Sequence, residues 1–69
     1  MIMFQHQQRL VEERNELLVK TAKLYDFIDD ENPVWGKIDP AEKKRMKRQH
    51  EHMIKYAKVL DERIAAFTK

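Results

Sequence analysis

The feature that most limits how this chain can fold is a regular spacing in its second half. Between Asp39 and Phe67, mostly apolar residues recur at alternating steps of four and three. This spacing is typical of a long helix that buries one stripe against another helix. Since such a helix cannot bury its stripe alone, a second element must lie against it. The residues of the stripe are Met46, His50, Met53, Ala57, Leu60, Ile64 and Phe67.

The first half of the chain predicts a second helix of similar length. Neither glycine nor proline interrupts the residues from Phe4 to Ile28. Apolar residues there form a face wider than a strict coiled-coil seam, so we expect this helix to contact more than one partner helix. The face consists of one row, Phe4, Val11, Leu18 and Tyr25, and a second row, Leu10, Leu17 and Leu24, extended by Thr21 and Ile28.

The segment between the two predicted helices has the composition of a turn. Pro33 disfavours helical geometry at Asn32, and Gly36 is the only glycine in the chain. We expect Trp35 to fold back onto the end of the core rather than to contact a ligand, because a large ring near a loop usually covers the nearest apolar surface.

The second helix begins with a recognisable cap. Asp39 is suited to the N-cap position and Pro40 to the first helical position, and Glu42 is placed to complete a capping box. The sequence therefore predicts an all-α fold with a single domain, residues 1–69. Helix 1 covers about residues 4–29, the turn about 30–38 and helix 2 about 40–67, forming an antiparallel hairpin.

Chain length indicates that the hairpin does not act alone. In a chain of 69 residues, the core rarely contributes more than about 3–5 kcal/mol to the free energy of unfolding. The chain has no cysteine, so no disulfide can add to this stability. We therefore expect two-helix hairpins to assemble into a helical-bundle homo-oligomer, either a dimer or a higher symmetric form.

Charge is unevenly distributed along the predicted hairpin. In a hairpin with this turn, the residue numbers of two residues that face each other should sum to about 72 to 74. Leu24 then lies near His50, and the acidic end of helix 1 comes beside the basic start of helix 2. Each cluster lies at the unfavourable end of its helix dipole, so we expect the clusters to pair with each other or with an outside ligand. The acidic residues are Asp26, Asp29, Asp30 and Glu31, and the basic ones are Lys43, Lys44, Arg45, Lys47 and Arg48.

Several function classes have little support in the sequence. Charged residues make up 38 % of the chain and no long apolar run exists, so we expect neither a membrane span nor a signal peptide, and a cytoplasmic location. Serine and cysteine are absent, and Thr21 and Thr68 have no adjoining base and carboxylate, so we expect no enzyme activity and no cofactor. The net charge of +2 gives little support for nucleic-acid binding.

The histidines do not predict a metal site. His50 and His52 are two residues apart, so on a helix their imidazoles diverge, whereas zinc-binding pairs need a spacing of three or four. We instead expect His50 to lie on the helix seam, hydrogen-bonded across the interface or setting its register.

The basic run from Lys43 to Arg48 allows two interpretations. It is either a solvated helix face neutralised by the acidic turn or a surface that contacts phosphates. Guanidinium groups and aromatic rings near helix interfaces suit a stacked nucleobase with its phosphate, but the same residues suit protein–protein contacts. The candidate ligand-binding residues are Lys20, Tyr25, Arg45, Arg48, Tyr56 and Arg63.

Two groups of residues, one in each half of the chain, carry a resemblance to known proteins. They are Arg9 to Glu13 with Glu16, Leu17, Lys23, Leu24, Phe27 and Ile28, and Gln49, Met53, Tyr56, Leu60, Arg63 and Ile64. Over almost its whole length the chain resembles a family of small phage and prophage helical-hairpin proteins. It is also similar to the hairpin of phage anti-defence sponges, which form oligomers and sequester cyclic nucleotide messengers of CBASS and Thoeris immunity.

The resemblance implies a phage-derived, oligomeric, non-enzymatic binding protein of the host cell cytosol. Its expected ligand is a cyclic oligonucleotide or a cyclic ADP-ribose-type signal. The alternative is a small helical protein that binds and inhibits or adapts a host protein by laying one helix face into a groove.

Overall fold

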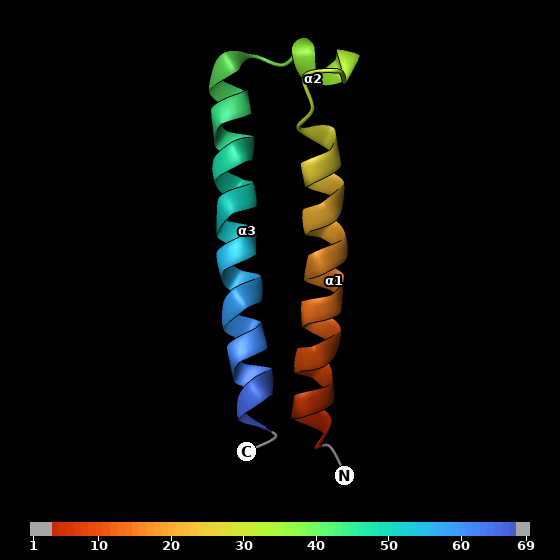
Figure 1. Cartoon of the computed structure of the whole chain (residues 1–69), viewed down its shortest axis with the longest axis vertical. Helices are drawn as coiled ribbons and strands as arrows, with labels where there is room; N and C mark the ends of the chain where they lie inside the picture. Colours follow the sequence, from red (N-terminus) through yellow and green to blue (C-terminus); the bar gives the residue numbers. More distant parts are fainter. Residues whose placement is uncertain (1–3, 68–69) are drawn as a thin grey trace.

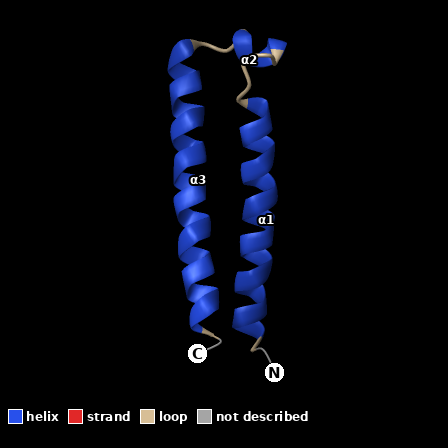
Figure 2. Cartoon of the chain, in the orientation of Figure 1, coloured by secondary structure: helices blue, strands red, loops and turns tan. Residues whose placement is uncertain are grey.

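The computed structural model describes residues 4–67, which are helical apart from short connections (Figure 2). This confirms the all-α class. The helices in this part of the chain are α1 (Gln5–Phe27), α2 (Pro33–Gly36) and α3 (Pro40–Ala66). The expected domain also includes residues 1–3 and 68–69, which lie outside the described residues.

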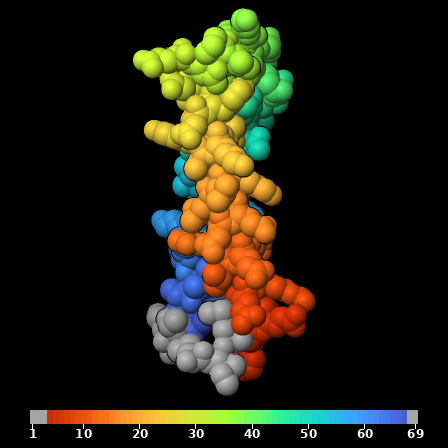
Figure 3. All heavy atoms as spheres, turned by 90° about the vertical axis from the view of Figure 1, so that its right-hand side faces the viewer, coloured from red at the N-terminus to blue at the C-terminus, as the bar shows by residue number. Residues whose placement is uncertain are grey.

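The two long helices α1 and α3 lie side by side and run in opposite directions (Figure 1). The chain forms a slender rod with Cα extents of 49 × 15 × 15 Å, as the space-filling view shows (Figure 3). The described start of α1 and the described end of α3 lie at the same end of the rod, and α2 lies at the other (Figure 1).

Local hydrogen bonds explain where the helices end and begin. Asn32 caps α2, because its side-chain oxygen accepts from the backbone N–H of Val34 at 3.0 Å. The same side chain donates to the carbonyl of Phe27 at 3.0 Å and so satisfies the last turn of α1. One amide thus joins two helix ends, and the expected turn of residues 30–38 contains the short helix α2.

The start of α3 follows the sequence prediction in part. Asp39 is the N-cap, its carboxylate accepts from the backbone N–H of Ala41 at 3.0 Å, and Pro40 opens the helix. The predicted capping box is wrong, because Glu42 instead accepts from the guanidinium of Arg45 at 3.0 Å. A basic residue three positions ahead on the helix competes for this carboxylate.

The core is a narrow seam between α1 and α3. Leu10 and Leu17 from α1 meet Ala57 and Leu60 from α3. Thr21 is also buried, and its hydroxyl donates to the carbonyl of Leu17 at 2.7 Å, which satisfies its polar atom. Three further apolar residues pack against this cluster: Met53, Ile64 and Phe67.

Trp35 closes the core at the end of the rod where α2 lies, which confirms the prediction for this residue. It is 2 % exposed, and its ring meets Phe27 edge to face, with ring centroids 6.1 Å apart. The ammonium groups of Lys43 and Lys47 lie 5.4 Å and 5.9 Å from the indole centroid. Each such contact contributes about 0.5–1 kcal/mol where the cation remains in water.

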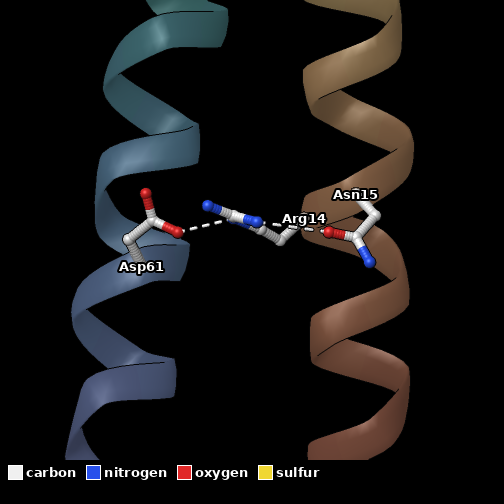
Figure 4. A network of polar contacts seen from close by, with 3 residues as sticks. All are labelled: Arg14, Asn15 and Asp61. Atoms are coloured by element: carbon white, nitrogen blue, oxygen red, sulfur yellow. Dashed lines mark hydrogen bonds and ion pairs between the residues drawn. The ribbon is translucent and has the colours of Figure 1, made fainter.

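One ion pair links the two long helices across the seam. The guanidinium of Arg14 donates to the Asp61 carboxylate at 2.7 Å and to the Asn15 side chain at 3.3 Å (Figure 4). Tyr25 and His50 face each other with ring centroids 5.7 Å apart. In each of these two cross-helix pairs the residue numbers sum to 75, slightly above the expected 72 to 74.

Removal of the Arg14–Asp61 pair is expected to have a small effect. The two side chains are 36 % and 50 % exposed, and solvent-exposed pairs contribute about 0.2–1 kcal/mol. Arg14→Ala should therefore lower the free energy of unfolding, measured by urea denaturation, by no more than about 1 kcal/mol. The double variant Arg14→Asp with Asp61→Arg should recover part of this loss, and a loss several times larger would contradict the assignment.

Candidate functional site

All six candidate ligand-binding residues are exposed to solvent, so each is available to a ligand. The aromatic ones differ in degree, since Tyr25 is 66 % exposed and Tyr56 is 45 % exposed. The guanidinium of Arg45 is already bound to Glu42. Lys20, Arg48 and Arg63 form no ion pair within residues 4–67.

Helical periodicity places three of these residues on one flank of α3. Arg45, Tyr56 and Arg63 each come one residue before a core-facing residue, namely Met46, Ala57 and Ile64. One residue turns the helix by about 100°, so all three side chains lie on the same side of the seam.

Lys20 occupies the equivalent flank of α1, because it comes one residue before the buried Thr21. In an antiparallel pair the sense of rotation is reversed between the helices, so the preceding flanks of both helices lie on the same side of the hairpin. With the register fixed by the Arg14–Asp61 and Tyr25–His50 contacts, Lys20 and Tyr56 lie at nearly the same level. We call the surface formed by Lys20, Arg45, Tyr56 and Arg63 the basic face.

The basic face is compact only around its centre. Arg63 lies seven residues from Tyr56 along α3, about 10 Å, whereas Arg45 lies eleven residues away on the other side, about 16 Å. Lys20, Tyr56 and Arg63 can therefore contact one small ligand together, while Arg45 lies beyond its reach. Glu13 shares the heptad position of Lys20, and Glu16 comes one residue before the buried Leu17, so two carboxylates lie on the same face.

Tyr25 belongs to the opposite face of the hairpin. It comes one residue after the seam residue Leu24, and its ring contacts His50. With Asp26, Ile28 and Asp29 it lines a half-open hollow of about 500 Å³. Two carboxylates make this hollow unsuitable for a phosphate group, so the expected cooperation of Tyr25 with the basic residues does not occur within one chain.

The basic run from Lys43 to Arg48 is not one surface. Two of its lysines lie over the indole of Trp35, and Arg45 binds Glu42. Of the two expected alternatives, pairing with the acidic turn does not occur, because no ion pair in residues 4–67 joins the run to Asp26, Asp29, Asp30 or Glu31. The nearby aromatic ring of Trp35 and the carboxylate of Glu42 occupy the cations instead.

His50 lies on the seam, as the helical periodicity predicts, but its contact differs from the one expected. His50 is half-buried on the seam, and within the described residues its imidazole makes the ring contact with Tyr25 rather than the expected hydrogen bond. Among residues 4–67 no three histidine, aspartate or glutamate side chains gather in a way that can hold a metal ion.

The sequence interpretation missed residues of the basic face that follow the same rule as Tyr56. Gln49, His52 and Val59 each come one residue before a seam residue, and all three are exposed. Val59 is 50 % exposed and adds an apolar contact beside Tyr56. The signal is a second heptad pattern, displaced by one residue from the core pattern.

None of the helices formed by residues 4–67 contains a stretch long and apolar enough to cross a membrane.

Comparison with known proteins gives one family. The family described as Sequestin matches residues 5–66, which include all three helices and the entire basic face. No curated protein and no solved structure is significantly similar to the chain. The family name is consistent with a protein that binds and sequesters a ligand. The chain belongs to the Sequestin family.

Proposed function

We propose that the chain is a phage-derived anti-defence sponge that sequesters a cyclic nucleotide immune signal in the host cytosol. The ligand is a cyclic oligonucleotide or a cyclic ADP-ribose-type molecule, held between subunits of a homo-oligomer. The observation that carries this proposal is that Lys20 and Tyr56 lie at one level, with Arg63 two turns away, on one exposed face, in a family named for sequestration.

The chemistry of this face matches the parts of a nucleotide. The ammonium of Lys20 and the guanidinium of Arg63 can bind phosphate oxygens, and guanidinium groups do so in a bidentate manner. The ring of Tyr56 can stack on a base, which contributes about 1–3 kcal/mol per base. The proposed mechanism is retention of the unchanged ligand, without bond cleavage.

Two copies explain the binding better than one. The basic face of a single chain is exposed to water and shared with Glu13 and Glu16, so it binds a phosphate weakly. The hollow beside Tyr25 is lined by two aspartates. Juxtaposed basic faces from two subunits double the positive charge and exclude water, which strengthens each phosphate contact.

The proposal is tested by calorimetric titration with common cyclic di- and trinucleotides and with cyclic ADP-ribose isomers. We expect at least one to bind with a heat well above dilution. Heat at the level of dilution for every ligand would refute the proposal. A linear dinucleotide of the same composition is the matched ligand control.

Tyr56→Ala should weaken that binding selectively. Loss of one stacked base removes about 1–3 kcal/mol, which corresponds to roughly 5- to 150-fold in Kd. The matched control is Lys55→Gln, because Lys55 is the exposed neighbour on the outer side of α3. Unchanged affinity in Tyr56→Ala, or equal loss in both variants, would remove Tyr56 from the site.

A host protein is the second candidate partner. Tyr56, Val59 and Arg63 share one exposed face, and aromatic and arginine side chains are common anchors in protein interfaces. In that case capture from host lysate should recover one stoichiometric partner. Charge reversal at Lys44 and Arg48, which are exposed and form no ion pair within residues 4–67, should weaken this capture in a salt-dependent way.

A further inference from the structure

The face of the hairpin opposite the basic face carries a row of uncovered apolar side chains. Along α1, Phe4, Leu18 and Tyr25 are 66 %, 38 % and 66 % exposed, and Val11, half-buried, completes their spacing of seven residues. Val11 and Leu18 each come one residue after a core residue, and Tyr25 comes one residue after the half-buried seam residue Leu24, so the row lies beside the seam. Ile54 of α3, which comes one residue after Met53 and is 50 % exposed, extends this surface. We call these five residues the apolar face.

Along α1, charge is segregated away from this face, whereas the same flank of α3 carries Glu51 and Lys58 on either side of Ile54. Between Arg14 and Asp26, the charged residues of α1 are Glu16, Lys20 and Lys23. Helical periodicity turns all three away from Leu18 by roughly 140° to 160°. Arg14 is neutralised by Asp61. The α1 row around Leu18 can therefore be dehydrated without burying an unpaired charge of α1.

We propose that the apolar face binds a second copy of the chain, with the two α1 helices antiparallel and Leu18 at the two-fold axis. Val11 and Tyr25 each lie seven residues from Leu18, so Val11 of one copy faces Tyr25 of the other. A row with a spacing of seven packs best against another long helix with the same spacing. The same row on two copies can pack together when a two-fold axis relates the copies, because a two-fold interface uses one surface of each subunit against itself.

Charge favours the antiparallel orientation. In the parallel arrangement, the acidic residues at the ends of the two α1 helices lie side by side and repel each other; they are Asp26 within α1 and Asp29 and Asp30 just beyond it. In the antiparallel arrangement these two acidic groups lie at opposite ends of the dimer. Opposed helix dipoles add a smaller contribution of the same sign.

The available area suits a stable dimer. Extents of 49 Å by 15 Å give one face of the rod a footprint of roughly 700 Å². Two such faces bury roughly 1,400 Å² in total, within the range of specific protein interfaces. The interface leaves the basic face uncovered, because that face lies on the other side of the hairpin. The proposed dimer and the proposed function both assume that the chain forms an oligomer. The dimer does not depend on whether the protein binds a nucleotide.

Cysteine cross-linking of the ligand-free protein tests the face and the orientation together, since the chain has no cysteine of its own. On oxidation, Leu18→Cys should form a disulfide-linked two-chain species, and Val19→Cys, on the outer side of α1, should remain a single chain. A mixture of Val11→Cys and Tyr25→Cys should cross-link, whereas Val11→Cys alone should not. Cross-linking of Val11→Cys alone would overturn the antiparallel arrangement.

Mass in solution provides the second readout. Wild type should have at least twice the 8.4 kDa chain mass by sedimentation equilibrium, and Leu18→Glu should shift the mass towards one chain. Val19→Glu is the matched control, because the neighbouring Val19 is 54 % exposed and should tolerate the same charge. A monomeric wild type, or an oligomer that neither Leu18→Glu nor Leu18→Cys affects, would overturn the proposal. Failure of nucleotide binding alone would leave it intact.

Discussion

Leu60→Ala should unfold most of the protein at room temperature. Leu60 is 1 % exposed and is the most deeply buried side chain of the core in residues 4–67. Truncation of a fully buried leucine costs about 2–5 kcal/mol, through lost transfer free energy and the cavity left behind. A core of this size supplies about 3–5 kcal/mol in total, so the loss is comparable to the whole stability. Circular dichroism at increasing urea concentration measures it.

The neighbouring residue offers a control for this experiment. Val59 lies next to Leu60 on α3 but is 50 % exposed, so Val59→Ala should change the free energy of unfolding by no more than about 0.5 kcal/mol. Alanine also favours the helix slightly more than valine does. Equal effects of the two substitutions would show that α3 is rotated differently about its axis.

Trp35→Ala should produce the second large loss, about 3–5 kcal/mol. Trp35 is 2 % exposed, meets Phe27 edge to face and lies beneath the ammonium groups of Lys43 and Lys47. Without the indole, the connection between α1 and α3 loses its only buried residue among residues 28–39. The midpoint of thermal unfolding, followed by circular dichroism, should fall accordingly.

A substitution of the adjacent Val34 shows whether the loss in Trp35→Ala comes from the buried indole or from any change in the connection. It lies in the same short helix and is 56 % exposed, so Val34→Ala should leave the midpoint nearly unchanged. Trp35→Phe should lie between wild type and Trp35→Ala, because a smaller ring fills part of the site. A midpoint for Trp35→Ala close to that of wild type would contradict the role of Trp35 as the closing residue of the core.

The basic face and the apolar face differ in how far the sequence defines them. Two rows of apolar residues in the first half are visible in the sequence, but only the structure shows that Leu10 and Leu17 are buried while Leu18 and Tyr25 are left exposed. For the same reason the sequence grouped Tyr25 with Tyr56, although they lie on opposite faces. Both rows have the same period, so periodicity does not decide which one faces α3.

The amino-acid sequence by itself determined the helical class, the connection near Pro33 and the cap at Asp39, because spacing, proline geometry and capping act within a few residues of chain. Only the tertiary structure decided the rotation and register of α1 against α3. These fixed the Arg14–Asp61 pair, placed Lys43 and Lys47 over Trp35, and separated a basic face from an apolar one. The physical reason is that a heptad pattern allows neighbouring rotations and shifts of similar energy, and contacts between distant residues select among them.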